Sequence, residues 1–244
     1  MSRILITGAS RGIGAACALA FAGAKARLAL ADLTAPDATA GQARAAGAAE
    51  VLALACDVSD PAAVAAMADR TRKAFGGLDV LVHCAGVIHE APLLETPIAD
   101  FDRVIAVNLR GSFLVGQAAI RLMNGTDAAP SRVILIASDM AYYGRETFSP
   151  YVASKHGVLG LVRSWAREFA PRILVNALCP GPIDTEMLGA ANMSAEWREK
   201  ELAIPLARFG QPDEVARLAL FLAGAGGAYV TGQGIGINGG SVMP

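Results

Sequence analysis

The chain contains 244 residues, of which 54% are hydrophobic and 18% are charged, and this composition excludes intrinsic disorder, a coiled coil and a solvated interaction tail. Its length fits one large α/β domain better than two average domains. The 21 lysines and arginines balance 22 aspartates and glutamates without a basic block, so no nucleic acid and no anionic membrane is expected as a partner. The expected partners are small molecules and further copies of the chain.

The cysteines and the ends of the chain indicate the compartment. Four cysteines lie far apart, without a C-x-x-C pair or a nearby histidine cluster, which predicts reduced thiols and no metal site. Residues 1–7 run directly into a glycine loop and lack the zones of a signal peptide. Residues 218–244 carry no charge, but glycines and polar residues interrupt them, which argues against a membrane span. We therefore expect a cytoplasmic protein.

Short β-branched or leucine-rich runs alternate with alanine-rich segments of helical length, which is typical of βα units on a parallel sheet. The strands are predicted at residues 3–7, 27–31, 51–55, 80–83, 132–137, 173–178 and 234–237. The helices are predicted at residues 13–24, 60–75, 97–123, 150–170 and 212–223, with a weaker one at 39–46. Most strands lack polar alternation, as expected when helices cover both faces. We predict an α/β fold with a single doubly wound domain of the Rossmann type over residues 1–244, containing a seven-stranded parallel sheet.

The connection from Gly181 to Leu206 breaks this rhythm, because it is long for a compact domain. We predict a substrate lid over about residues 184–206. An extra surface helix packed on the body is the alternative interpretation.

The first predicted strand leads into a glycine-rich loop and then an apolar helix. Glycines permit a tight turn and let the backbone approach a pyrophosphate at the positive end of the helix. An ordinary strand-to-helix turn is the alternative, but the position in the first βαβ unit favours nucleotide binding. The expected contacts are Gly8, Ser10, Arg11, Gly12, Ile13 and Gly14.

Two acidic residues at strand ends refine the cofactor prediction. Asp32 closes the second strand, where its carboxylate can accept hydrogen bonds from ribose hydroxyls and repel a 2′-phosphate. Asp32 therefore favours NAD over NADP, whereas Arg11 in the glycine loop could pair with a 2′-phosphate and favours NADP. The alternative interpretation of Asp32 is a helix N-cap. Asp57 after the third strand can accept from an adenine amino group or serve as a turn acceptor.

A second cluster of residues carries the predicted chemistry. Tyr151 and Lys155 are spaced i,i+4 on a helix that we expect to begin with Ser149 as its cap, so the ammonium should lower the pKa of the phenol toward neutrality. Such a phenol can exchange a proton with an alcohol or carbonyl. Ser138 directly follows the fifth predicted strand and can reach the same rim of the sheet. Asn108 is a polar residue in an apolar helix, which indicates either a buried hydrogen-bonding role or a helix distortion.

The chain resembles the short-chain dehydrogenase/reductase family over essentially its whole length. The motifs that carry this resemblance are the glycine loop 7–14, Asp57, Ala85-Gly86, Asn108, Ser138, Tyr151 with Lys155, Pro180-Gly181-Pro182-Ile183-Asp184-Thr185, and the tail Tyr229-Val230-Thr231-Gly232-Gln233 with Gly239-Gly240. One departure is Cys84, which stands where the family usually has asparagine and which replaces a strong hydrogen-bonding group with a weak one.

The resemblance implies a role for each residue of the site. Tyr151 would be the general acid/base, Lys155 would lower its pKa and bind the nicotinamide ribose, Ser138 would polarise the carbonyl, and Asn108 would hold a relay water. The further cofactor contacts implied are Val58 and Val107 beside the adenine, Ile183 and Thr185 at the carboxamide, and Ala85, Gly86, Pro180 and Gly181.

The expected function is hydride transfer between NAD(H) and a secondary alcohol or ketone. The alternative function is that of a 3-oxoacyl-[acyl-carrier-protein] reductase using NADPH. Asp32 and the absence of lysine and arginine from residues 122–130 argue against this alternative. Arg172 remains available to bind an acidic carrier. A non-catalytic dinucleotide sensor and an epimerase or dehydratase are further alternatives. The predicted pocket lining is Met140, Tyr142, Tyr143, His89, Met187 and Trp197. The resemblance also implies a homotetramer, for which the uncharged tail is suitable interface material.

Overall fold

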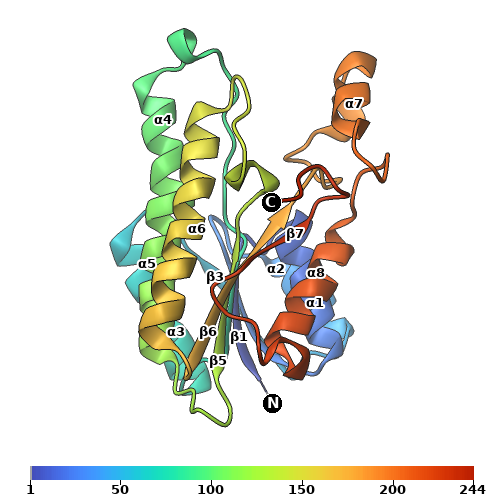
Figure 1. Cartoon of the computed structure of the whole chain (residues 1–244). Coiled ribbons are helices and arrows are strands. Elements are labelled where there is room, and N and C mark those ends of the chain that lie inside the picture. Colours follow the sequence, from blue (N-terminus) through green and yellow to red (C-terminus); the bar gives the residue numbers. More distant parts are fainter. Residues whose placement is uncertain (1) are drawn as a thin grey trace.

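A parallel sheet of seven strands forms the centre of the computed structural model, which describes residues 2–244 (Figure 1). The strands are β1 (Arg3–Thr7), β2 (Arg27–Asp32), β3 (Glu50–Ala55), β4 (Val80–His83), β5 (Ser131–Ile136), β6 (Ile173–Pro180) and β7 (Gly234–Ile237). Their order is β3-β2-β1-β4-β5-β6-β7, and every neighbouring pair is parallel. The predicted doubly wound class and the seven predicted strands are confirmed, with ends that shift by two residues at most. Met1 lies outside the described residues.

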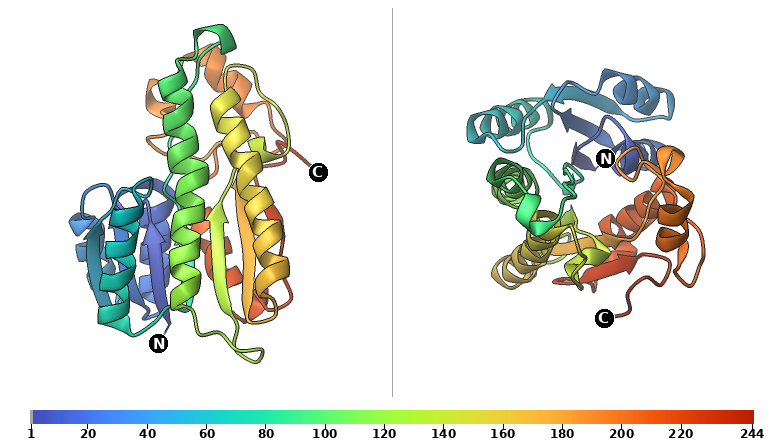
Figure 2. Two further views of the ribbon diagram at one scale, coloured as in Figure 1. Left: turned by 90° about the vertical axis from the view of Figure 1, so that its left-hand side faces the viewer. Right: turned by 90° about the horizontal axis from the view of Figure 1, so that it is seen from above.

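Helices cover both faces of this sheet (Figures 1 and 2). The helices are α1 (Gly12–Gly23), α2 (Asp37–Ala45), α3 (Pro61–Phe75), α4 (Ile98–Ile105), α5 (Gly111–Leu122), α6 (Ser149–Phe169), α7 (Ala195–Leu202) and α8 (Pro212–Ala223). One hydrophobic core joins the sheet to α3, α5 and α6, and a second core joins it to α1, α2 and α8. Successive residues of β1 show the reason: Leu5 belongs to the first core, whereas Ile4 and Ile6 belong to the second. Both faces of the strands are therefore apolar.

The strand order reverses between β1 and β4, because the chain passes from β1 to β2 on one side and places β4 on the other. Loops that leave the carboxyl ends of these two strands diverge and create a crevice, which is where doubly wound sheets bind ligands. The loops also touch closely at their roots: Gly8 has a φ of +64°, and a Cβ atom there would lie 2.7 Å from the backbone nitrogen of Ala85. Only glycine fits this position without displacing the β4 loop.

Two helix predictions need correction. The single helix expected at residues 97–123 is interrupted by a π-helical turn, Ala106–Arg110, between α4 and α5, and Asn108 lies inside this turn. The helix expected to begin behind a Ser149 cap instead includes Ser149, and Phe148 takes the N-cap position without a side-chain hydrogen bond. Pro150 in the first turn supplies the start signal, because its missing N–H has no partner to lose there.

The last third of the chain provides the structures around the crevice. Residues 181–206 contain a 3₁₀ turn (Ala190–Asn192) and α7, which stands beyond the carboxyl edge of the sheet (Figure 2). The uncharged residues from 218 onward form the second half of α8, a short turn and β7. Within residues 2–244, none of the helices is both long and apolar enough to span a bilayer.

Candidate active site

A cavity of about 690 Å³ lies at the carboxyl edge of the sheet, against the loops that follow β1, β4, β5 and β6. Every predicted catalytic or cofactor-binding residue lines it, except Ser10 and Asn108. The cavity extends from Asp32 at one end to Ser138, Tyr151 and Lys155, and from there to α7. The structure thus brings the predicted cofactor residues and the predicted catalytic residues into one continuous space.

The glycine loop leaves the N-terminus of α1 free of protein partners. Arg11 occupies the N-cap position without a side-chain cap, and the first turn contains no acidic residue. The backbone N–H groups and the helix dipole therefore suit an anionic group such as a pyrophosphate. Ser10 is an exposed residue of the loop, and its backbone nitrogen donates to Asp32 Oδ2 at 2.9 Å. This free cradle and the length of the cavity fit a dinucleotide.

Asp32 and Arg11 are held differently. The Asp32 carboxylate accepts hydrogen bonds from two backbone N–H groups, those of Ser10 and Leu33, which fix it at the rim of the cavity. Arg11 Nη1 instead pairs with Glu186 Oε2 at 2.5 Å, and both side chains are about 70% exposed. An ion pair this exposed adds little stability, so Arg11 is free to move.

Asp57 serves as a turn acceptor, which was one of its two predicted roles. Its Oδ1 accepts hydrogen bonds from the backbone nitrogen of Ser59 at 2.8 Å and from its hydroxyl at 2.7 Å. The Asp57 side chain lines the cavity as well, together with Val58 and Val107.

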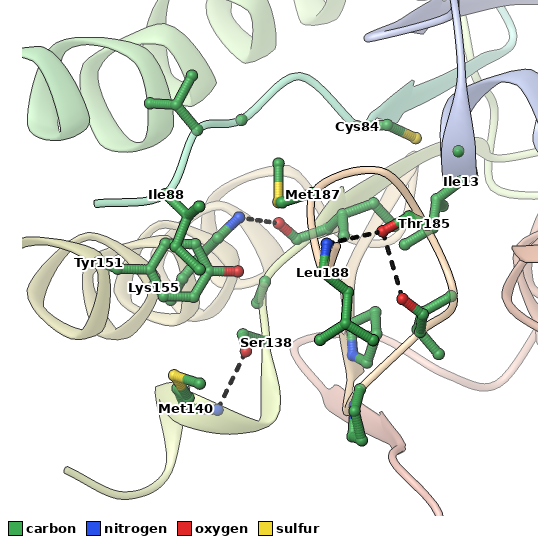
Figure 3. Close-up of a pocket in the computed structure, with 18 of the residues that line it drawn as sticks. Ile13, Cys84, Ile88, Ser138, Met140, Tyr151, Lys155, Thr185, Met187 and Leu188 are labelled. Atoms are coloured by element: carbon green, nitrogen blue, oxygen red, sulfur yellow. Dashed lines mark hydrogen bonds between the residues drawn. The ribbon is translucent and has the colours of Figure 1, made fainter. Parts of the chain in front are cut away.

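Ser138, Tyr151 and Lys155 face the same part of the cavity (Figure 3). Lys155 Nζ donates to the carbonyl oxygen of Ile136 at 2.8 Å and lies 5.5 Å from the centroid of the Tyr151 ring. The last residue of β5 thus anchors the ammonium of α6. Ser138 Oγ lies 3.0 Å from Asp139 Oδ1, to which it can donate, and accepts a hydrogen bond from the backbone nitrogen of Met140. The Ser138 hydroxyl is oriented by these neighbours.

The predicted lowering of the Tyr151 pKa is wrong for the protein alone. Burial raises the pKa of Tyr151 to about 12, and this effect outweighs the opposing effect of its hydrogen bond with Ser138. The nearby ammonium does not reverse the shift, and burial also lowers the pKa of Lys155, to about 8. Tyr151 is therefore protonated at neutral pH.

Asn108 connects three segments rather than lining the cavity. Its Oδ1 accepts from the backbone nitrogen of Val87 at 2.8 Å, and its Nδ2 donates to the Val87 carbonyl and to Ser154 Oγ. The π-helical turn therefore ties the β4 loop to helix α6, one residue before Lys155. Both predicted alternatives apply, since Asn108 is buried and lies at a helix distortion.

Cys84 is accommodated by a substitute hydrogen bond. The Thr7 hydroxyl accepts from the backbone nitrogen of Ala85 at 3.3 Å and contacts His83 Nδ1 at 2.7 Å, so the β4 loop is held without an asparagine. A hydrogen bond to Cys17 and burial raise the pKa of the Cys84 thiol, which keeps it protonated and unreactive.

The substrate end of the cavity differs in part from the prediction. Met140, Tyr143, Met187 and Trp197 line it, whereas Tyr142 and His89 do not. The Tyr142 hydroxyl donates to the Gly234 carbonyl instead, and His89 faces Asp100 at 3.7 Å.

Several charged or polar residues that line this end were not predicted from the sequence, namely Glu90, Asp139, Arg145, Lys200, Glu201 and Ser241. Asp139 could have been predicted from the sequence, because it directly follows Ser138 at the end of a strand. Arg145 and Glu201 could not, since their contact depends on how α7 is placed. In the described residues, no group of three or more His, Cys, Asp or Glu side chains is arranged to hold a metal ion.

Comparison with known proteins gives full-length similarities. A family model described as "Enoyl-(Acyl carrier protein) reductase" matches residues 8–241. The chain is 38% identical to a 3-oxoacyl-[acyl-carrier-protein] reductase FabG of Thermotoga maritima, covering 98% of this chain and 97% of the relative. It is also 38% identical to a D-threitol dehydrogenase of Mycolicibacterium smegmatis, covering 97% and 91% of the two chains.

Solved structures are equally similar. A dehydrogenase/reductase from Sinorhizobium meliloti superimposes with a TM-score of 0.92 at 37% identity, covering 99% of this chain and 95% of the other. A short chain dehydrogenase from Burkholderia cenocepacia, solved in complex with NADP, gives a TM-score of 0.89 at 34% identity, covering 98% and 97%.

The doubly wound sheet, the glycine loop at its switch point and a serine, tyrosine and lysine in one cavity define an α/β oxidoreductase. Together with the full-length similarities, they identify the chain as a member of the short-chain dehydrogenase/reductase family.

We predict that burial of the Lys155 ammonium destabilises the fold. The folded-state pKa of Lys155 is about 8, below its ordinary value of 10.5, so the unfolded chain binds more protons between these values and stability should rise with pH across this window. Lys155→Met should therefore stabilise the fold near pH 7 by roughly 1 to 3 kcal/mol. That advantage should shrink as the pH rises from 8 toward 10.

Urea denaturation of both proteins across this pH range measures the effect, and Lys73→Met, at an exposed lysine of α3, is the matched control. If the gain in unfolding free energy of Lys155→Met does not change with pH, burial of the charged lysine does not destabilise the fold.

Proposed function

We propose that the protein is an NAD(H)-dependent oxidoreductase that interconverts a secondary alcohol and its ketone, with Tyr151 as the general acid/base. The observation that carries this proposal is the convergence of Tyr151, Ser138 and Lys155 on one wall of a cavity that begins at the glycine loop. An alcohol–carbonyl conversion requires a proton donor and a second hydrogen-bonding group at the reacting oxygen, and this wall supplies both.

Each of these residues would act at a defined atom. Ser138 Oγ would donate to the substrate oxygen and polarise the carbonyl, while Tyr151 Oη would deliver the proton to that oxygen during reduction and take it back during oxidation. The bound nicotinamide supplies a hydride to the carbonyl carbon or accepts it. A Tyr151 that is protonated at neutral pH is in the state that reduction requires.

Lys155 would bind the ribose hydroxyls of the nicotinamide half and offset negative charge on the phenol. Asn108 would act as a positioning residue through Val87 and Ser154, and holding a relay water is a further proposed role that its second Oδ1 lone pair permits.

The remaining cavity walls would hold the cofactor. Gly12, Ile13 and Gly14 would receive the pyrophosphate, and Val58 and Val107 would contact the adenine, with Asp57 near its amino group. The β6 loop would complete the nicotinamide subsite through Pro180, Gly181, Ile183 and Thr185, opposite Ala85 and Gly86.

The preference for NAD rests on Asp32. Two backbone hydrogen bonds hold this carboxylate at the rim, where a 2′-phosphate would meet an unscreened negative charge. Arg11 is the opposing feature, and the Burkholderia cenocepacia relative was solved in complex with NADP.

Asp32→Ala should lower the ratio of kcat/KM for NAD to kcat/KM for NADP by about 10- to 100-fold, because it removes both the ribose acceptor and the repulsion. Steady-state kinetics with each cofactor measure this ratio. Asp37→Ala removes a charge of the same sign from an exposed position in α2 outside the cavity and should leave the ratio unchanged. A wild-type preference for NADP would refute the assignment.

The function itself is tested with purified protein, NAD and a panel of secondary alcohols at mildly alkaline pH, and with NADH and the corresponding ketones. Turnover is expected in both directions, and Tyr151→Phe should reduce kcat by about 100- to 10,000-fold while cofactor affinity is retained. Cofactor binding without turnover would support a sensor instead, and substrate conversion without a net change in NADH would indicate an epimerase or dehydratase.

A 3-oxoacyl-[acyl-carrier-protein] reductase using NADPH is the second candidate, because relatives such as that of Thermotoga maritima carry this name. The residues considered above for contact with an acidic carrier lie away from the cavity. Residues 122–130 and Arg172 both lie at the amino end of the sheet, where Met123 pairs with Leu78 and Ser131 bonds to Arg172, on the side opposite to the cavity. Neither bears on how an acidic carrier would approach the site.

Residues 184–206 would serve as the substrate lid. They supply Thr185, Met187, Leu188 and Trp197 to the cavity, which supports this role over that of a mere surface helix.

We further propose a cytoplasmic homotetramer. Apolar side chains are exposed on α4 and α5 and again near α8 and the tail, where Phe101, Phe113, Phe221, Tyr229 and Met243 offer surfaces for association. Light scattering should give four times the 25.1 kDa mass of the chain, and a monomer at micromolar concentration would contradict the proposal.

A further inference from the structure

An ion pair lies in the wall of the substrate end of the cavity, outside the residues that the proposed reaction uses. Arg145 Nη2 donates to Glu201 Oε1, and the two side chains are only 16% and 9% exposed. Arg145 belongs to the connection between β5 and α6, and Glu201 belongs to α7. Both side chains line the cavity that contains Tyr151.

Aromatic rings fix the position of the Arg145 guanidinium. Its central carbon lies 4.9 Å from the centroid of Phe148 and 5.1 Å from that of Trp197. Phe148 packs in one cluster with Tyr151, and Trp197 contacts the same cluster. The ion pair and the Tyr151 phenol therefore border the same aromatic cluster.

The arginine is also pre-organised for hydrogen bonding. Although burial lowers its pKa, the hydrogen bond to Glu201 raises the pKa of Arg145 above its ordinary value, so the side chain stays charged. A guanidinium has five N–H donors, of which the contact with Glu201 uses one, and the glutamate retains lone pairs that can accept. A donor array and an acceptor thus lie side by side in the cavity wall.

The charges at this end of the cavity cancel. Glu90, Asp139 and Lys200 also line it, and the Lys155 ammonium faces the adjoining part of the cavity, so that three acidic and three basic side chains are present. A substrate carboxylate would gain little from an arginine that is already paired, and an alkyl chain would remove water from the pair without replacing its hydrogen bonds. A hydroxyl group suits the pair best, because it can accept from Arg145 and donate to Glu201 at once.

We propose that Arg145 and Glu201 recognise the distal hydroxyl groups of a small, uncharged polyol or of the matching hydroxyketone, and so determine the substrate class of this enzyme. This inference rests on the proposed alcohol–ketone oxidoreductase function. It assigns the pair to substrate selection rather than to chemistry. The relative named D-threitol dehydrogenase is consistent with a polyol in a site of this fold.

The test compares substrates and variants together. Linear polyols of four to six carbons and 2-alkanols of equal length are assayed with NAD by the formation of NADH. The wild type should prefer polyols by about 10- to 100-fold in kcat/KM, the value expected for hydrogen bonds to charged groups. The double variant Arg145→Met/Glu201→Leu replaces the pair with apolar groups of similar shape and leaves no unpaired charge. It should lose this preference mainly through KM.

The single variant Glu201→Gln keeps the packing and should show an intermediate loss. The matched control is Arg27→Met/Glu50→Leu, because Arg27 also pairs with a glutamate and stacks on a phenylalanine, Phe75, but lies outside the cavity. It should retain the wild-type preference.

Each outcome separates this inference from the proposed function. Equal turnover of polyols and 2-alkanols by the wild type would refute the inference and leave the oxidoreductase intact. Equal losses toward both substrate types in the double variant would show that the pair only fastens α7 to the body. No turnover of any alcohol or ketone with NAD(H) or NADP(H) would refute the proposed function and the inference with it.

Discussion

The site depends on an ammonium held inside the protein beside a phenol. Lys155 is attached to the end of β5 by its hydrogen bond to the Ile136 carbonyl, and burial acts on both partners, depressing the pKa of the lysine and raising that of Tyr151. The packing of α6 against the sheet must therefore offset the free-energy cost of burying the Lys155 charge. Core residues on the inner side of this helix, such as Val158 and Trp165, provide the compensating burial. Catalytic geometry and hydrophobic packing are thus carried by one helix.

The second support of the site is the contact between the loops after β1 and β4. Gly8 passes the β4 backbone so closely that no side chain fits, and the Thr7 hydroxyl bonds to Ala85 across the same gap. Asn108 then fastens the other end of the β4 loop to α6 through Val87 and Ser154. The proposed cofactor half and the proposed catalytic half of the cavity are therefore aligned by a single short segment.

Much of this arrangement was predictable from sequence because local patterns determine it. Strands buried on both faces appear as unbroken apolar runs, and the i,i+4 spacing places Tyr151 and Lys155 on one face of a helix whatever surrounds them. Features that depend on three-dimensional placement were missed. The contact between Arg145 and Glu201 joins residues 56 positions apart, and the position of residues 122–130 follows from the direction of the strands. The pKa of Tyr151 was mispredicted because spacing shows the neighbouring charge but not the degree of burial.

The segment over the cavity is fastened unequally at its two ends. The contact of Glu186 with Arg11 lies in solvent, where dissolved salt weakens it, whereas the contact of Glu201 with Arg145 is shielded between aromatic rings. Movement of residues near Glu186 therefore costs less free energy than displacement of α7. A dinucleotide would therefore enter and leave past the loose edge while the compartment for the other reactant keeps its shape.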